Sequence, residues 1–172
     1  MAPRAIIIGA PGAGKTSVGR RVADRLGVPF HDSDAAIQKR AGKPVSDIFL
    51  ADGEAEFRRL EREVIAESLR DADGVLSVGG GAVLDPETRE AFSRHTVVWL
   101  EVDLASATKR VGMNSARPLL MGNVRGTMAT MLNERTPLYQ EVATVTVDTS
   151  GRPLKEVVND VVEELKRVGT PS

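Results

Sequence analysis

The chain has 172 residues, of which 41% are hydrophobic and 27% charged, and these proportions are typical of one globular domain. A formal net charge of −1 supplies no broad basic face, so we expect no nucleic-acid partner. The sequence contains no cysteine, which excludes disulfides, thiolate zinc sites and cysteine nucleophiles and fits a cytoplasmic location. The first apolar run meets glycine and proline far short of the roughly 20 residues that a membrane helix needs. We therefore expect no membrane anchor, and we expect a monomer because no apolar seam for self-association is evident.

Apolar, β-branched runs alternate with helical patterns along the whole chain. The apolar runs predict five strands, at 4–8, 28–32, 75–78, 96–102 and 144–148. Apolar residues at helical spacing predict helices at 16–26, 35–41, 54–69, 86–93, 104–111 and 154–167, preceded in one case by a short segment at 45–51. Strands that are apolar throughout and separated by helices indicate a parallel sheet covered on both faces. We therefore expect one α/β domain over residues 1–172, with ligands bound beyond the carboxyl ends of the strands.

Three local features refine this outline. Gly27 is expected to end the first helix, and Asp85 to cap the helix that begins with Pro86. The segment 112–126 shows no clear period and is bounded by glycines. We expect this segment to form a mobile lid.

The first strand runs into the sequence GAPGAGKT, residues 9–16, which fits the phosphate-binding pattern G-x-x-x-x-G-K-[ST] in full. Its glycines allow backbone N–H groups to surround phosphates, and the helix that follows adds the positive end of its dipole. Lys15 can reach the β- and γ-phosphates, and the Thr16 hydroxyl can ligate Mg²⁺. The expected nucleotide contacts here are Gly12, Ala13, Gly14, Lys15, Thr16 and Ser17.

Other signatures of nucleotide-binding proteins help to sort the class. A GTPase needs a guanine-reading N-K-x-D after a strand, and the sequence has none. Motor ATPases often end a strand with paired acidic residues, and the nearest stretch here, VVWLEVD at 97–103, lacks the pair. The small size of the chain and its arginine-bearing lid segment favour a small-molecule kinase.

Two carboxylates and three glycines follow the second and third strands. Asp32 and Asp34 are two residues apart, and in extended backbone they would project to the same side. One could orient Mg²⁺ and the other could accept hydrogen bonds from a hydroxylated acceptor, although Asp34 could instead simply cap the helix at 35–41. The row Gly79, Gly80 and Gly81 permits close approach of the backbone to a ligand.

Arginines are the remaining chemical clue. Arg58 has Glu61 one turn away on the same helix, so the two could pair on the surface. Arg117 lies in the lid segment, and Arg135 stands near a helix end. Phosphoryl transfer spreads negative charge over the equatorial oxygens, so guanidinium groups that can move toward them suit the reaction. We take Lys15, Asp34 and Arg117 as the candidate catalytic residues.

Six stretches of the chain are typical of one family: GAPGAGKTSVGRRVA, FHDSDAAIQ, IFLADGEAEFRRLE, SVGGGAV, RPLL and RTPLY. On these stretches the chain resembles the shikimate kinases, and it is similar to actinobacterial members over nearly its full length. The resemblance implies a P-loop kinase fold of the nucleoside-monophosphate-kinase type, with a five-stranded parallel sheet in the order 2-3-1-4-5. It also implies transfer of the γ-phosphate of ATP to the 3-hydroxyl of shikimate.

The resemblance further assigns roles to residues. Asp34, Arg58, Gly79, Gly80, Gly81 and Arg135 would bind shikimate, and Phe49 and Phe57 would shape the wall of its pocket. Thr16 and Asp32 would support Mg²⁺. Arg117 would move in with the lid, while Arg110 and Arg152 would lie against adenine.

Two alternatives stay open at this point. A neighbouring kinase of gluconate or of a nucleoside monophosphate has the same phosphate loop, although the sequence has no GFPR-type stretch for a nucleotide acceptor. A non-catalytic regulator that binds ATP would have the same fold. An acceptor panel distinguishes the kinases, and ATP binding without turnover would indicate the regulator.

Overall fold

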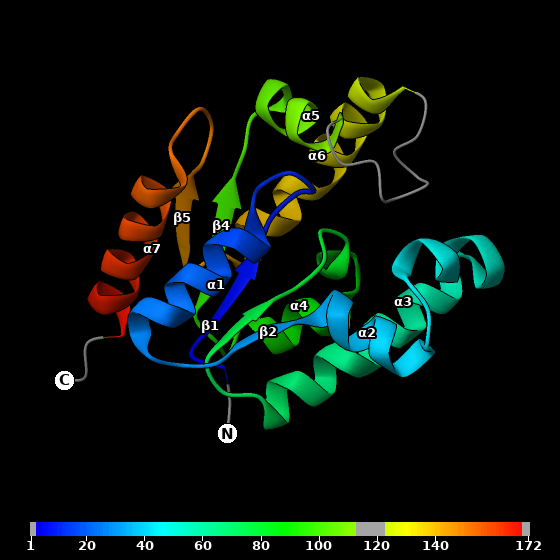
Figure 1. The fold of residues 1–172 in the computed structure, drawn as a ribbon, viewed down its shortest axis with the longest axis horizontal. Coiled ribbons are helices and arrows are strands. Elements are labelled where there is room, and N and C mark those ends of the chain that lie inside the picture. Colours follow the sequence, from blue (N-terminus) through cyan, green and yellow to red (C-terminus); the bar gives the residue numbers. More distant parts are fainter. Residues whose placement is uncertain (1–2, 113–122, 170–172) are drawn as a thin grey trace.

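A five-stranded parallel sheet forms the centre of the computed structural model, which describes residues 3–112 and 123–169. Its strands are β1 (Ala5–Ile8), β2 (Phe30–Asp32), β3 (Val75–Ser77), β4 (Val97–Glu101) and β5 (Val145–Asp148). The spatial order is β2-β3-β1-β4-β5, and every neighbouring pair is parallel (Figure 1). The fold class and strand order expected from the sequence are confirmed.

Helices cover both faces of this sheet. In chain order they are α1 (Lys15–Leu26), α2 (Ser33–Ala41), α3 (Val45–Asp71), the 3₁₀ turn η1 (Ala82–Leu84), α4 (Pro86–Phe92), α5 (Leu104–Gly112), α6 (Val124–Val142) and α7 (Leu154–Val168). Helices α1 and α7 lie together on one face, and α4 and α6 lie on the opposite face (Figure 1). None of the helices within the described residues is long and apolar enough to cross a membrane.

The core explains why β1 and β3 lack an alternating pattern. All four residues of β1 are buried, and β3 is buried throughout, because helices pack against both sides. A second, smaller apolar cluster lies between α2 and α3 and includes Ile37, Ile48 and Phe57. The segment α2–α3 therefore has its own packed interior beside the β2 edge of the sheet.

Several helix ends follow the expected chemistry. Gly27 ends α1 with φ 68°, and its N–H donates to the carbonyl of Ala23. Asp85 accepts a hydrogen bond from the Thr88 N–H, and Pro86 occupies the first helical position. These two predictions are confirmed.

The start of α2 corrects another prediction. Asp32, and not Asp34, caps this helix, because Asp32 Oδ1 accepts a 2.9 Å hydrogen bond from the Asp34 N–H. The helix begins at Ser33, so Asp34 lies in its first turn instead of in extended backbone. The interpretation of Asp34 as a simple cap is therefore wrong.

Helix α3 has a break that separates its two predicted segments. Gly53 inside it has φ 87° and ψ 167°, which are not helical values. Phe49 and Phe57 lie on either side of this break, and their rings stack with centroids 4.7 Å apart. The short segment at 45–51 and the long helix after Glu54 are thus joined by apolar packing.

Helix α6 was not predicted as a helix. It begins at Val124, where Asn123 caps it by accepting a hydrogen bond from the Gly126 N–H, and it contains Pro137. The last residues of the expected lid, 124–126, therefore form its first turn, and Arg135 lies well inside the helix and not near its end. Residues 113–122 of that lid, including Arg117, lie outside the described residues.

Candidate active site

The phosphate loop joins β1 to the start of α1. Gly12 and Gly14 both have φ 85°, a left-handed conformation that glycine adopts without strain. A Cβ on Gly12 would lie 2.9 Å from the carbonyl oxygen of Ala107 in α5, so the loop also runs too close to its neighbour for a side chain. Helix α1 has no side-chain cap at its N-terminus, which leaves its first N–H groups for phosphate oxygens.

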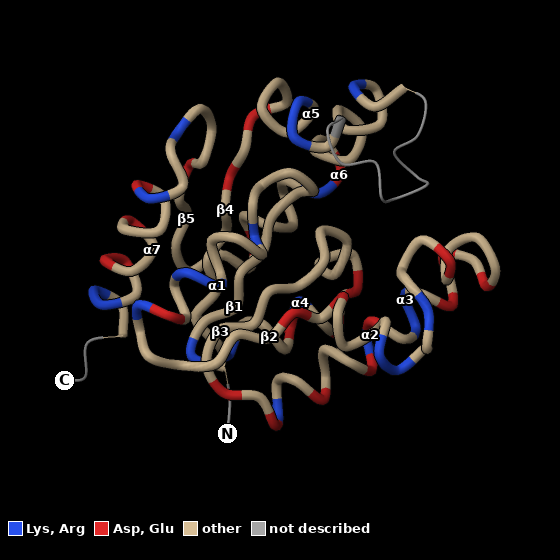
Figure 2. Tube along the Cα trace, in the orientation of Figure 1, with Lys and Arg blue, Asp and Glu red and all other residues tan. Residues whose placement is uncertain are grey.

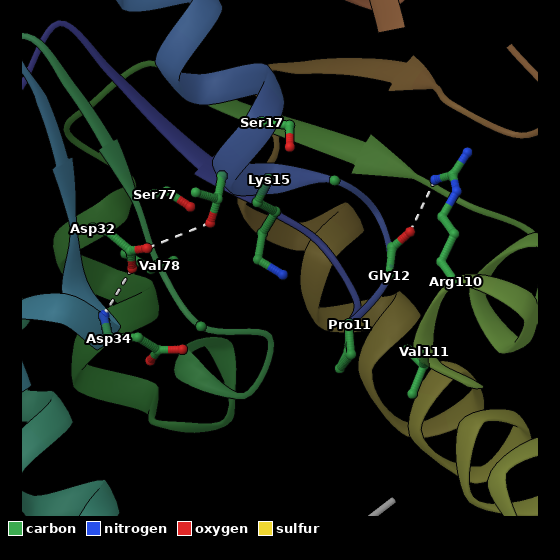
Figure 3. Close-up of a pocket in the computed structure, with 13 residues that line it drawn as sticks. Pro11, Gly12, Lys15, Ser17, Asp32, Asp34, Ser77, Val78, Arg110 and Val111 are labelled. Carbon is green, nitrogen blue, oxygen red and sulfur yellow. Dashed lines mark hydrogen bonds between the residues drawn. The ribbon is translucent and has the colours of Figure 1, made fainter. Parts of the chain in front are cut away.

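Lys15 holds its ammonium group over this loop. Its Nζ donates to the carbonyl oxygens of Gly9 at 2.9 Å and Ala10 at 3.2 Å. In Figure 3 the side chain extends into the pocket between the carboxylates on one side and Gly12 on the other. The cation is thus already placed where the β- and γ-phosphates of a nucleotide in this loop would lie.

The pocket beside the phosphate loop has a volume of about 370 Å³. It brings together most of the predicted nucleotide residues, both predicted metal residues and two predicted acceptor residues, Asp34 and Gly79. The lining consists of Pro11, Gly12, Gly14, Lys15, Thr16, Ser17, Asp32, Asp34, Ser77, Val78, Gly79, Arg110 and Val111. Ala13, in the same loop, is 1% exposed and does not line this pocket.

Thr16 and Asp32 form an all-oxygen pair at one side of this pocket. The Thr16 hydroxyl donates to Asp32 Oδ2 at 3.4 Å. Burial raises the pKa of Asp32, and the nearby charge of Asp34 raises it further. A hydroxyl beside a partly desolvated carboxylate suits a hard cation such as Mg²⁺. The described residues hold no cluster of three or more His, Cys, Asp or Glu, so an ion here would need phosphate oxygens and water as additional ligands.

The glycine row after β3 lies between the Asp34 carboxylate and the Arg58 guanidinium. A Cβ on Gly79 would lie 3.3 Å from Asp34 Oδ1, and one on Gly81 would lie 2.3 Å from Arg58 Nη2. A side chain at either position would therefore displace a functional side chain. A second cavity of about 230 Å³ continues from Gly81 along Arg58 and Arg62.

Arg58 pairs with Glu61 in the interior and not on the surface as one alternative held. Its Nη1 donates to Glu61 Oε1 at 2.7 Å, and the Glu61 side chain is only 4% exposed. Glu61 was not proposed as a site residue, because an acidic residue one turn from an arginine is common on exposed helices. Its burial could not be inferred from the local pattern.

Arg135 faces the same region from α6. The residue is 7% exposed, and its Nε has no hydrogen-bond partner among the described residues. Burial lowers the pKa of Arg135, and the nearby charge of Arg58 lowers it further. Two arginines that lie close together and away from water form a strong attraction for an anionic ligand.

The surrounding surface does not supply this attraction. Figure 2 shows acidic and basic residues interspersed along α3 and along α7, with no long stretch of one sign. Several of the basic residues on α3 are paired with acids, such as Arg59 with Glu56 and Glu63. Recognition of an anion therefore depends on the arginines within the site.

Arg110 and Arg152 lie together at the far side of the phosphate loop. Arg110 donates to the carbonyl oxygens of Gly12 at 2.9 Å and Thr149 at 3.1 Å, whereas Arg152 donates to Asp148 O at 2.8 Å and Asp160 Oδ2 at 2.7 Å. Both line a groove of about 220 Å³ whose apolar side includes Leu154. A flat base could lie in this groove between an aliphatic wall and the guanidinium planes.

This arrangement defines a P-loop kinase: a phosphate loop after β1, a carboxylate pair after β2 and an anion-binding wall after β3 share one edge of a parallel sheet. A family model described as shikimate kinase matches residues 11–166. The chain belongs to the shikimate kinase family.

Individual relatives agree with this assignment. A shikimate kinase of Thermobifida fusca is 53% identical over 167 residues, covering 97% of both chains. A solved shikimate kinase of Acinetobacter baumannii, in complex with shikimate, superposes with a TM-score of 0.92 at 32% identity and covers 98% of this chain and 94% of its own. A gluconokinase of Sinorhizobium meliloti has a TM-score of 0.66 at 23% identity over 95% of this chain and 91% of its own, which shows a shared fold alone.

Proposed function

We propose that this chain transfers the γ-phosphate of ATP to the 3-hydroxyl of shikimate, giving shikimate 3-phosphate and ADP. The observation that carries the proposal is the pair of guanidiniums, Arg58 and Arg135, withdrawn from water at the edge of the phosphate-loop pocket. A single ring carboxylate would accept hydrogen bonds from both guanidiniums and offset the charge of Arg135, since Arg58 is already paired with Glu61. Family membership and the relative solved with shikimate support the same acceptor.

The acceptor would lie between the arginines and the carboxylate of α2. Arg58 and Arg135 would bind its carboxylate, and backbone N–H groups of Gly79–Gly81 would add donors. Asp34 would accept hydrogen bonds from the ring hydroxyls, which fits its place against Gly79 at the wall of the pocket. This arrangement points the reacting hydroxyl toward Lys15 and the phosphate loop.

The donor would lie along the loop and the adjacent groove. Backbone N–H groups from Gly12 to Ser17 would surround the phosphates, and Lys15 would bind the β- and γ-oxygens. Arg110 and Arg152 would border adenine. Arg117, which lies outside the described residues, is assigned to the γ-phosphate by the family resemblance.

The metal-binding residues would be Thr16, as a direct ligand, and Asp32, acting through water. Bound Mg²⁺ supplies positive charge that offsets the charge developing on the phosphate oxygens. In the transfer itself, the 3-hydroxyl oxygen forms a bond to the γ-phosphorus while the bond from that phosphorus to the bridging oxygen of ADP breaks. Asp34 orients the hydroxyl and receives its proton, and Lys15 and Arg117 stabilise the transferring group.

We also propose that the protein is a monomer that acts in the cytoplasm. Sedimentation velocity with and without both reactants would test the monomer. A dimer formed only with reactants would contradict it.

An acceptor panel tests the proposed function. The protein is incubated with ATP and Mg²⁺ plus shikimate, gluconate or AMP, and ADP release is measured by a coupled assay. We expect release to depend strongly on shikimate alone. Equal release with buffer would contradict the proposal, as would a preference for gluconate or AMP. Tight ATP binding without turnover on any acceptor would instead support the regulator.

A further inference from the structure

Tyr139 is a buried residue for which the proposed reaction has no stated use. It is the only tyrosine of the chain and is 1% exposed. It lies on α6 one helical turn after Arg135. Its hydroxyl donates a 2.6 Å hydrogen bond to the carbonyl oxygen of Gly80, the middle residue of the glycine row. A buried hydroxyl thus connects the helix that bears Arg135 to the loop that backs Arg58.

The ring of Tyr139 is held as firmly as its hydroxyl. Trp99 on β4 stacks against it, with centroids 5.8 Å apart and an interplanar angle of 30°. Burial raises the pKa of Tyr139 to about 12, which keeps the hydroxyl protonated near neutral pH. The hydroxyl therefore remains a donor under any condition in which the enzyme would work.

Gly80 is packed on its other side against the phosphate loop. A Cβ on Gly80 would lie 2.9 Å from Pro11 Cδ and 3.2 Å from the carbonyl oxygen of Gly9. The backbone of Gly80 is therefore confined between α6 and the loop that would bind the donor. Holding this one residue fixes the acceptor wall relative to the donor loop.

The hydrogen bond also sets the orientation of the next donor group. The Gly80 carbonyl and the Gly81 N–H belong to one peptide unit, and the described chain has no cis peptide. In a trans peptide these two groups point in opposite directions, so fixing the carbonyl fixes the N–H. Gly81 lies against the Arg58 guanidinium, and its N–H has no hydrogen-bond partner in the described ranges of the chain.

We propose that Tyr139 is a positioning residue for the acceptor: its hydroxyl holds the Gly80–Gly81 peptide so that the Gly81 N–H joins Arg58 and Arg135 in binding the acceptor carboxylate. The inference rests on the proposed function of this site. Tyr139 touches neither reactant and acts through the glycine row and through its interaction with Arg135. Its loss should therefore affect acceptor binding far more than ATP binding.

The test is Tyr139→Phe, which removes the hydroxyl and keeps the ring. Loss of one buried hydrogen bond that orders a charged site should raise the KM for shikimate about tenfold. The KM for ATP should stay within about twofold, because Lys15 and the loop N–H groups are unchanged. An unchanged KM for shikimate would overturn the proposal, and so would equal rises in both KM values. A wild-type chain without shikimate-dependent turnover would contradict the proposed function. The comparison of Tyr139→Phe with the wild type tests the role of Tyr139.

Trp99→Phe is the matched control. It weakens the ring stack but leaves the hydroxyl of Tyr139 and its acceptor in place. It should lower the melting temperature while leaving the KM for shikimate within about twofold. A rise as large as that of Tyr139→Phe would show that aromatic packing, and not the hydrogen bond, is responsible.

A measurement on the unmutated sequence keeps the proposal testable if either variant folds poorly. Because Tyr139 is the only tyrosine, 3-fluorotyrosine incorporation gives one ¹⁹F resonance. We expect shikimate to shift this resonance, and an otherwise identical acceptor without the carboxylate to shift it much less. No shift with shikimate, or the same shift with both compounds, would overturn the proposal.

Discussion

The Arg58 guanidinium donates to the buried Glu61 carboxylate over 2.7 Å, one turn along α3. Its Nε lies 3.5 Å from the Glu54 carboxylate on the other side, and the arginine side chain is 18% exposed. A buried ion pair is weak evidence for stability, because desolvation of both charges offsets their attraction. Its position beside Gly81 is better explained by function: Glu61 and Glu54 fix the guanidinium so that its remaining edge can bind an anion.

Removing the guanidinium should therefore weaken acceptor binding selectively. Loss of hydrogen bonds to a charged group in Arg58→Ala should raise the KM for shikimate roughly 10- to 100-fold. The KM for ATP should change much less, because Arg58 does not line the phosphate-loop pocket. Steady-state kinetics with each substrate varied in turn measures both values.

The control is the next residue on the helix. Arg59 is 49% exposed and pairs with Glu56 and Glu63, and such exposed pairs contribute little. Arg59→Ala should leave both KM values near those of the wild type. If Arg58→Ala changed the two KM values equally, Arg58 would not belong to the acceptor site.

The strands and the phosphate loop could be predicted because their signals are local. The strands β1, β3 and β4 are largely buried apolar runs, and the loop is a contiguous motif between a strand and a helix. Helix α6 was missed because Gly126 and Pro137 lower its intrinsic helix preference. Its burial of Met128 and Tyr139 against the rest of the protein is a tertiary effect that no local pattern contains.

The site was predicted residue by residue, but its internal contacts were not. The roles of Asp32 and Asp34 depend on where α2 begins, and a shift of two residues exchanged the cap. The burial of Glu61 and the hydrogen bond from Tyr139 both depend on elements distant in the sequence. Contacts of this kind form only in the folded protein, and the spacing of residues along the sequence does not predict them.

The glycine row offers a second prediction, with two adjacent substitutions that should differ. Gly81→Ala would place a Cβ 2.3 Å from Arg58 Nη2, so this flexible side chain must turn away. A small displacement of a positioned group can reduce the rate by about 100-fold, and here we expect the loss to fall on the KM for shikimate. Gly80→Ala would instead press on Pro11 in the phosphate loop at 2.9 Å, so both KM values should rise. Identical changes in KM for the two variants would contradict the expectation that Gly81 affects the acceptor site alone and Gly80 affects both sites.

Asp32 gives a prediction about pH and stability. Because its pKa is raised in the folded state, the native protein binds more protons than the unfolded chain between the two pKa values, so stability falls as pH rises through that interval. Asn keeps the cap of α2 but carries no charge. In EDTA, Asp32→Asn should therefore melt at a higher temperature than the wild type at pH 7.5, and the difference should shrink as pH falls toward 4. A variant that melts lower at pH 7.5 would contradict this sign.

The same substitution should impair the use of metal. A residue that acts on a metal through water typically contributes 10- to 100-fold to affinity, so the Mg²⁺ concentration for half-maximal rate should rise by about that factor in Asp32→Asn. Titration of the rate with Mg²⁺ at saturating ATP and shikimate measures it. Asp73→Asn is the control, since Asp73 precedes the amino end of β3 and Asp32 lies at the carboxyl end of β2. An unchanged Mg²⁺ requirement in Asp32→Asn would remove Asp32 from the metal site.

Arg135 leads to the last prediction, in which stability and binding change in opposite directions. Its guanidinium is 7% exposed and lies near Arg58, so the unliganded protein keeps two like charges in a poorly hydrated place. Keeping an ion away from water in a protein interior costs several kcal/mol, so Arg135→Met should raise the melting temperature without ligand. Arg94→Met, at an exposed position, should stay within about 0.5 kcal/mol of the wild type.

Shikimate should stabilise the wild type far more than the variant. At 100 times its Kd a ligand stabilises the wild type by about 2.7 kcal/mol, and the shift in melting temperature should nearly vanish in Arg135→Met because the acceptor carboxylate has lost a partner. Thermal melts of each protein without ATP, recorded with and without shikimate, measure both the unliganded stability and the shift caused by shikimate. A variant that is less stable without ligand yet keeps the full shikimate shift would mean that Arg135 supports the fold and takes no part in acceptor binding.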